Sequence, residues 1–173
     1  PIHDDSANRV GRAIERLQRE FDQPLRIEGL ARDGGLAVPG TMPHVDAETL
    51  ERWRALTYPQ LATEVIGLFA GDIPRDDLAR MTDAAYAPFP SEVVPLRPIG
   101  DGLTLVGLSE GPTLAFKDMA MQFLGQVLEY ALERSGSVLN VLGATSGDTG
   151  SAAEHALRGK DRIAVFMLSP HGR

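Results

Sequence analysis

Hydrophobic residues recur at helical spacing along the first half of the chain. In residues 6–22, apolar side chains follow a three-four spacing with charged residues between them, which predicts an amphipathic helix. Similar spacing predicts three shorter helices, from Asp46 to about Leu56, from Tyr58 to Phe69 and from Pro74 to Tyr86. Residues 25–43 contain a Gly-Gly turn and two prolines, so this stretch is expected to be a connector.

The pattern changes after residue 90, where short apolar runs alternate with helical segments. The predicted elements are strands at Val93–Leu96, Leu103–Leu108, Val138–Leu142 and Arg162–Leu168, a long helix at Thr113–Arg134 and a shorter helix from Asp148 to about Arg158. Such alternation favours right-handed crossovers and a parallel sheet covered by helices. The sequence therefore predicts an α/β fold, with a mostly helical region at residues 1–90 and an α/β domain at residues 91–173.

Composition narrows the classes of function. Hydrophobic residues make up 43% and charged residues 24%, as in ordinary globular proteins. A net charge of -7 argues against a nucleic-acid partner, which needs a basic face. Without cysteine there is no thiolate chemistry, and the four histidines are scattered without metal-ligand spacing. No stretch is long enough for a membrane span and the start lacks signal-peptide features, so a cytoplasmic location is expected.

A glycine-rich turn, Gly143–Gly150, lies between a predicted strand and a predicted helix. Thr145, Ser146 and Thr149 supply hydroxyls there, and a helix N-terminus adds partial positive charge, so the turn suits a carboxylate or a phosphate. The alternative is plain helix capping. Asp148 is either a cap or an acceptor for the phenolic oxygen of a bound ring. The turn lacks the Gly-Lys-Ser/Thr ending of a nucleotide loop and the dinucleotide spacing.

Lysine is rare in this sequence, which contains only Lys117 and Lys160. Arginine cannot form a Schiff base, whereas a desolvated lysine is a carbonyl nucleophile. Because Lys117 lies beside Phe116 and Met119, we hypothesise that it holds an aldehyde cofactor. The alternative is a solvated surface charge whose stem covers apolar neighbours. Asp118 is expected to be a helix cap or an ion-pair partner.

Two long segments resemble a known family. Gly111–Gly125 (GPTLAFKDMAMQFLG) and Leu142–Ala153 (LGATSGDTGSAA) resemble the two N-terminal signatures of bacterial threonine synthase, a pyridoxal-phosphate enzyme of the tryptophan synthase β-type fold. Asp33–Leu36, Gly71–Pro74 and Ser169–Arg173 resemble that family in the expected order. The resemblance implies part of a parallel-sheet sandwich of fold type II. Residues 1 to about 24 do not follow the family's usual opening, and family members are longer, so an incomplete chain is expected.

The resemblance also implies a reaction. Lys117 would form a Schiff base with pyridoxal 5'-phosphate and then move protons on the substrate carbons, while the cofactor acts as the electron sink. The reaction would convert the small molecule O-phosphohomoserine and water to L-threonine and phosphate. The implied site residues are Thr145, Ser146 and Thr149 for the substrate carboxylate, Asp148 for the 3-hydroxyl of the cofactor, and Arg173 for the substrate phosphate.

Two other interpretations stay open at this point. One is a dehydratase or another replacement enzyme of the same fold that acts on hydroxy-amino acids. The Ser-Gly-Asp-Thr-Gly sequence at residues 146–150, in place of Ser-Gly-Asn, disfavours it. The other is a non-catalytic fragment that retains the motifs as scaffold, which agrees with the absence of the family's loop for the cofactor phosphate.

Overall fold

The computed structural model describes Pro39 and residues 41–170. The helix predicted at residues 6–22, the Gly-Gly turn and Arg173 lie outside the described residues. The chain divides into two compact units, Pro1–Met42 and Pro43–Arg173. The helices and strands that follow all belong to the second unit.

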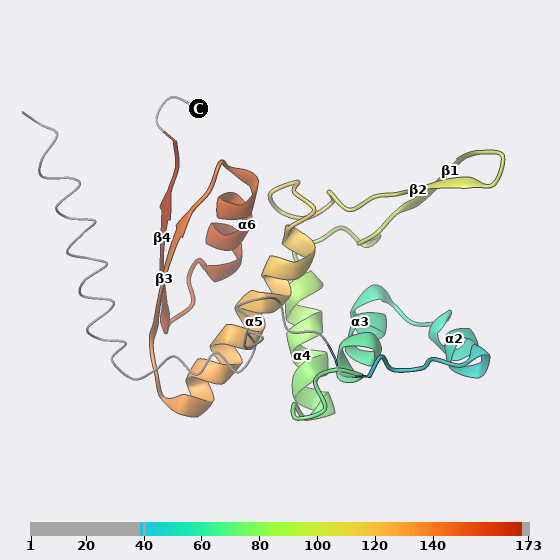
Figure 1. Ribbon diagram of the computed structural model, residues 1–173, viewed down its shortest axis with the longest axis horizontal. Coiled ribbons are helices and arrows are strands. Elements are labelled where there is room, and N and C mark those ends of the chain that lie inside the picture. Colours follow the sequence, from blue (N-terminus) through green and yellow to red (C-terminus); the bar gives the residue numbers. More distant parts are fainter. Residues whose placement is uncertain (1–38, 40, 171–173) are drawn as a thin grey trace, which may run out of the picture. The chain divides into compact units, whose positions relative to one another are not determined.

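Three short helices open the second unit, as predicted (Figure 1). They are α2 (Ala47–Trp53), α3 (Tyr58–Gly67) and α4 (Arg75–Tyr86). Side-chain hydrogen bonds at the first turns mark where α2 and α3 begin. The Asp46 carboxylate accepts a hydrogen bond from the backbone N–H of Thr49 at 2.8 Å, and Gln60 accepts one from the N–H of Thr57 at 2.9 Å. Pro74 directly precedes α4, where a missing N–H costs nothing.

The main apolar core joins α4 to the next helix, α5 (Asp118–Ser135). The Tyr86 hydroxyl donates a hydrogen bond to the Met119 carbonyl at 3.2 Å, and the Tyr58 ring packs edge-on against Tyr86 with centroids 4.8 Å apart. The buried members of this core are Ala85, Tyr86, Phe89 and Val93, with Met119 and Phe123 packed against them. The first turn of α5 is therefore held against α4.

Helix α5 also packs against α6 (Asp148–Leu157), so it lies between two helices (Figure 1). A Cβ atom added to Gly125 would lie 2.7 Å from the carbonyl oxygen of Ala156, so the two helices approach closely. Gln122 Nε2 lies 3.2 Å from Nδ1 of His155 across the same contact. These short contacts fix α6 against the N-terminal half of α5.

Strands β3 (Leu139–Ala144) and β4 (Ile163–Leu168) pair in parallel, with α6 as the crossover between them. Their register runs from Leu139 opposite Ile163 to Ala144 opposite Leu168. The predicted strand, helix and strand are thus confirmed. Because the strands are parallel, both carboxyl ends lie at the same edge of the sheet, where ligands commonly bind in α/β folds.

The prediction that residues 103–108 join the parallel sheet is wrong for the described residues. Strand β2 (Leu103–Val106) pairs antiparallel with β1 (Leu96–Gly100) in a separate two-stranded ribbon. The reason is the turn at residues 100–102, where all three φ angles are positive, at 107°, 44° and 76°. Such a turn sends the chain straight back along itself. The strand predicted at Val93–Leu96 is also wrong for most of its length, because β1 begins only at Leu96.

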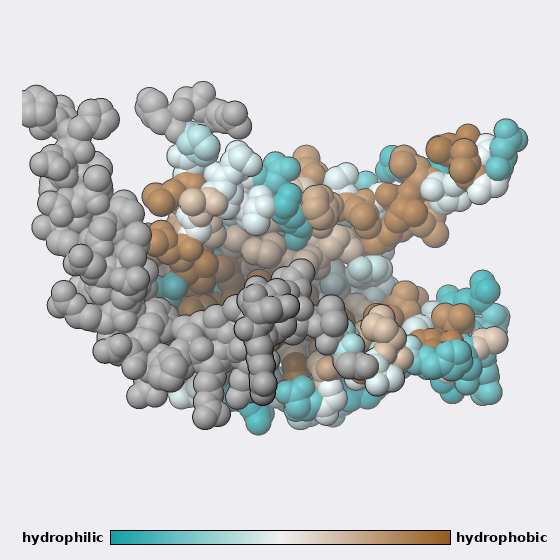
Figure 2. Space-filling model, viewed as in Figure 1, coloured by the Kyte–Doolittle hydropathy of each residue, from teal (hydrophilic) through white to brown (hydrophobic). Residues whose placement is uncertain are grey.

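The β1–β2 ribbon exposes its apolar side chains. Leu96 and Ile99 are 62% and 63% exposed, and Figure 2 shows hydrophobic surface over this ribbon. Among the described residues, Arg97 of β1 forms an ion pair with Glu110 at 3.7 Å. Among the described residues, no helix is both long enough and apolar enough to cross a membrane.

Candidate functional site

Lys117 stands directly before α5, at its N-cap position, with φ of -65° and ψ of -22°. The helix was predicted from Thr113, but it begins at Asp118, and residues 113–117 form turns instead. The Lys117 carbonyl accepts the N–H of Met121 at 2.9 Å, which begins the helical ladder. We call residues 111–117 the lysine loop.

The two lysines have different surroundings. Lys160 forms an ion pair with Glu129, and its side chain is only 10% exposed. No carboxylate of the described residues forms an ion pair with Lys117, whose Nζ lies 4.5 Å from the centroid of the Phe116 ring. The Lys117 side chain is half-buried, whereas Phe116 is 60% exposed. Lys160 therefore serves the packing of α5, while no ion pair within the described residues holds the amine of Lys117.

Asp118 is fully buried at the base of the lysine loop. Its two carboxylate oxygens accept hydrogen bonds from the backbone N–H and from the side-chain hydroxyl of Thr113, both at 2.8 Å. Sequence reasoning anticipated a cap or an ion pair for Asp118 but missed Thr113. The five-residue separation does not match the three-residue spacing of a capping box, so the sequence carried no recognised signal for this pair.

Thr145 organises the glycine-rich turn between β3 and α6. Its Oγ1 atom accepts hydrogen bonds from the backbone N–H groups of Gly147 at 3.1 Å and Gly150 at 3.0 Å. A Cβ atom added to Gly150 would lie only 2.8 Å from this oxygen, so the close approach requires glycine there. A hydroxyl has two lone pairs and one proton. With both lone pairs in use, Thr145 keeps its proton for an acceptor outside the turn.

The other predicted residues of this turn are exposed. Asp148 and Thr149 form the first turn of α6. They precede the first hydrogen bond of the helix, which the N–H of Ser151 donates to the Gly147 carbonyl at 2.9 Å. Thr145 and Ser146 line a pocket at the carboxyl ends of both parallel strands. The whole lining is Ala144, Thr145, Ser146, Leu168, Ser169 and Pro170. Lys117, Asp148 and Thr149 do not line this pocket, and Arg173 lies outside the described residues.

A second pocket joins the lysine loop to α6. Thr113 from the loop lines it together with Ser151 and His155 from α6 and Val165 from β4. Lys117 and Asp148 are far apart in the sequence, yet the lysine loop lies beside α6, the helix that begins at Asp148. The structure therefore brings the two signature segments to one region of the second unit.

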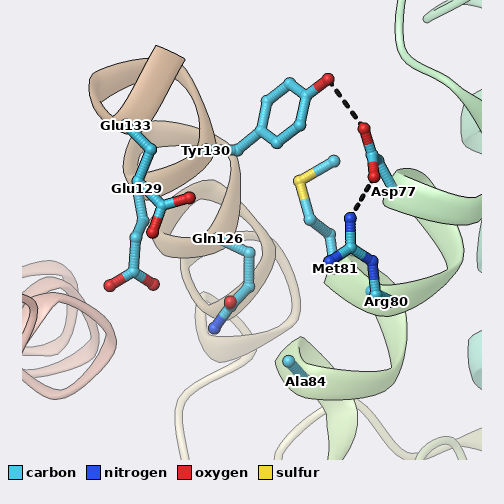
Figure 3. A pocket seen from close by; sticks show the side chains of 8 residues that line it. All are labelled: Asp77, Arg80, Met81, Ala84, Gln126, Glu129, Tyr130 and Glu133. Atoms are coloured by element: carbon cyan, nitrogen blue, oxygen red, sulfur yellow. Dashed lines mark hydrogen bonds and ion pairs between the residues drawn. The ribbon is translucent and has the colours of Figure 1, made fainter. Parts of the chain in front are cut away.

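A third pocket lies between α4 and α5 and contains none of the predicted site residues (Figure 3). Tyr130 donates a hydrogen bond to the Asp77 carboxylate at 3.1 Å, and Arg80 pairs with the same carboxylate. The Arg80 guanidinium lowers the pKa of Asp77 below its ordinary value. Because the bond between Tyr130 and Asp77 joins α5 to α4 across this pocket, we assign the pocket to helix packing.

Known proteins match this chain in sequence and in structure. The family profile described as "Threonine synthase N terminus" matches residues 17–86. The threonine synthase of Corynebacterium glutamicum is 53% identical over 154 residues, which cover 85% of this chain and 32% of that protein. The crystal structure of PLP-bound threonine synthase from Brucella melitensis superposes with a TM-score of 0.79 at 43% identity, over 84% of this chain and 32% of that one.

The chain is homologous to the N-terminal part of threonine synthases. Yeast threonine synthase supports the same relation, with a TM-score of 0.77 at 42% identity. The predicted resemblance to the N-terminal part of threonine synthases and the predicted α/β fold class are both confirmed. The chain spans about a third of the length of the threonine synthases that it matches.

Proposed function

We propose that this chain forms the lysine-bearing part of a threonine synthase, which converts O-phosphohomoserine and water to L-threonine and phosphate with pyridoxal 5'-phosphate. One observation carries the proposal. Lys117 lies directly before α5 with an amine that no carboxylate of the described residues occupies, in a segment homologous to threonine synthases. One of those relatives is described as PLP bound.

The described residues fit such a cofactor. A lysine that binds an aldehyde must not be held in an ion pair, and of the two lysines only Lys160 forms one within the described residues. When bound, pyridoxal phosphate supplies an electron sink for charge that develops on the substrate carbons. The Nζ atom of Lys117 would hold the aldehyde covalently. Once substrate has replaced it, the same atom would accept and return protons at the substrate carbons.

The glycine-rich turn would bind the substrate carboxylate. The donors to an anion would be the hydroxyl proton of Thr145, the exposed hydroxyls of Ser146 and Thr149, and the backbone N–H groups of Asp148 and Thr149. Asp148 would lie by the cofactor's 3-hydroxyl. The contact of Arg173 with the substrate phosphate stays a prediction.

We retain the division into a mostly helical region at residues 1–90 and a lysine-bearing α/β part at residues 91–173. We also propose a cytoplasmic location, which the absence of cysteine from this sequence supports.

The first test is an assay of the protein in its natural length. We expect pyridoxal phosphate and O-phosphohomoserine to yield threonine and inorganic phosphate in equal amounts. The Lys117→Arg variant keeps the charge but cannot bind an aldehyde, so it should lose several orders of magnitude in kcat. Product analysis for threonine and phosphate in the same reaction checks both expectations.

The control is Lys160→Arg, which keeps a cation opposite Glu129 and should retain wild-type activity. Keto acid formed from serine or threonine, with no reaction of O-phosphohomoserine, would instead identify a dehydratase of the same fold. A natural-length protein that is inactive on all three compounds would contradict catalysis altogether.

A further inference from the structure

The lysine loop has a backbone that its own residues do not favour. Leu114 has a φ of 59°, in the left-handed region that leucine rarely adopts, and its side chain is 74% exposed. Because so little of this side chain is buried, its packing does not explain the conformation. A strained residue persists only where surrounding contacts fix it. Something else in the loop must therefore hold this turn.

Asp118 supplies those contacts from the end of the loop. Its carboxylate accepts both the N–H and the hydroxyl of Thr113 at 2.8 Å, which closes residues 113–118 into a ring that contains Leu114 and Lys117. Two backbone bonds subdivide the loop, from the Leu114 N–H to the Gly111 carbonyl and from the Asp118 N–H to the Ala115 carbonyl, both at 3.0 Å.

The fit around this carboxylate is close. A Cβ atom added to Gly111 would lie 2.4 Å from the Cβ and 2.6 Å from Oδ2 of Asp118, so only glycine lets the loop pass there. Asp118 is fully buried, and among the described residues the hydrogen-bond partners of its carboxylate all belong to Thr113. A buried carboxylate needs such partners, because an unsatisfied one would be costly. The contact between Asp118 and Thr113 therefore holds the loop in one conformation.

Lys117 lies inside this ring, one residue before the carboxylate. Its backbone is tied on the helix side by the bond from Met121, and on the loop side by the ring that Thr113 and Asp118 close. The ring sets the direction in which the Lys117 side chain leaves the backbone. Displacement of a reacting group by about 1 Å can lower a rate by about a hundredfold.

We propose that Asp118 is a positioning residue that holds the lysine loop through Thr113, so that the Lys117 amine is presented at one place. The inference rests on the proposed function, in which this amine binds pyridoxal phosphate. Asp118 contacts neither cofactor nor substrate in this proposal. It acts only through the backbone of residues 113–117.

The test compares Asp118→Ala with Asp118→Asn in the protein in its natural length. Asp118→Ala removes both acceptors. Asp118→Asn keeps both contacts, because the amide oxygen accepts the Thr113 N–H while the Thr113 hydroxyl turns to accept from the amide nitrogen. Thr113→Val removes only the hydroxyl bond. Asp161→Ala, at an exposed turn, is the control for loss of one carboxylate.

Two readouts are measured for each variant. The first is the pyridoxal phosphate concentration needed for half-maximal borohydride trapping on Lys117, followed by peptide mass spectrometry. The second is hydrogen exchange of the amides of residues 113–118 without cofactor. For Asp118→Ala we expect that concentration to rise about tenfold or more and the loop amides to exchange faster. For Asp118→Asn and Asp161→Ala, the trapping concentration should stay within about twofold of wild type. For Thr113→Val, it should lie between the values of wild type and Asp118→Ala.

The outcomes separate this proposal from the proposed function. Wild-type trapping and exchange in folded Asp118→Ala would overturn the positioning role, as would an Asp118→Asn variant as impaired as Asp118→Ala. If Asp118→Ala does not fold, Thr113→Val decides the same question, because a wild-type result in both readouts overturns the role. A wild-type protein that traps no cofactor on Lys117 removes the proposed function, and loop exchange alone then decides whether Asp118 orders the loop.

Discussion

In each of the two segments proposed to carry chemistry, one side chain accepts two hydrogen bonds. Thr145 accepts from two N–H groups of the glycine-rich turn, and Asp118 accepts the N–H and hydroxyl of Thr113. Each contact closes a short loop that has no helix or strand of its own. At the residue scale, the site is therefore ordered by polar side chains that lie next to its reactive groups. The apolar core contributes by holding the first turn of α5 in place.

Ionisation of the buried Tyr86 phenol makes the free energy of unfolding depend on pH. Burial raises the pKa of its phenol above the ordinary value of 10.0, and burial also raises that of Tyr58. Below pH 10 both folded and unfolded chains keep the proton, so stability is unaffected. Above pH 10 the unfolded chain loses its proton first, so we expect the free energy of unfolding to fall as the pH rises. Urea denaturation between pH 7 and 12 measures this.

The Tyr86→Phe variant separates the two roles of that hydroxyl. At pH 7 it loses the hydrogen bond to the Met119 carbonyl, at a cost of about 1 kcal/mol. Above pH 10 it should lose less stability than wild type, because one titrating phenol is gone. Parallel pH dependences for the two proteins would contradict the assignment.

Some of the site residues could be predicted from their type and spacing, and others could not. Lys117 stood out because lysine is rare in this sequence and because its neighbours are apolar. The bond between Thr113 and Asp118 depends on the φ angle of Leu114, which no residue type indicates. The role of Thr145 as acceptor for two N–H groups likewise follows from how the turn folds. Contacts that depend on backbone conformation could therefore not be predicted from residue types.

At the scale of elements, α5 is organised differently on its two sides. Met119 and Phe123 pack against the apolar core with α4, as the hydrophobic pattern indicated. The residues buried in the helix itself are Asp118, Gln122 and Gly125, at spacings of four and three. This second stripe is polar and small, which allows the close approach of α6.

Gly125 tests that approach. In Gly125→Ala, a methyl group would meet the Ala156 carbonyl oxygen at 2.7 Å, so one helix must move. After allowance for the better helix propensity of alanine, we expect the free energy of unfolding to fall by about 1–2 kcal/mol. Chemical denaturation measures it. In the control Gly71→Ala, nothing lies within 4 Å of the new methyl group, and the change should stay within about 0.5 kcal/mol. Equal effects of the two substitutions would contradict close packing of the helices.

The strand predictions show a second limit at this scale. Alternation of apolar runs and helices predicted β3, α6 and β4 correctly, because a buried crossover unit has few alternatives. The same alternation placed residues 103–108 in the parallel sheet, although the Gly-Asp-Gly sequence at residues 100–102 is a hairpin signal. Local turn chemistry decided the pairing there.

At the scale of the whole molecule, the chain spans about a third of the length of its threonine synthase relatives. Within that third, the packing of α5 against α6 brings the lysine loop beside the helix that carries Asp148 and Thr149. The central claim of this account is that Lys117, and not Lys160, holds an aldehyde cofactor there.

Borohydride reduction with pyridoxal phosphate, followed by peptide mapping of the natural-length protein, tests this claim most directly. In wild type and in Lys160→Arg, we expect the reduced cofactor on Lys117. In Lys117→Arg, we expect no adduct at position 117. The ion pair with Glu129 should protect Lys160 from labelling. An adduct on Lys160 with Lys117 unmodified, or a Lys117→Arg protein that retains full activity, would contradict the account.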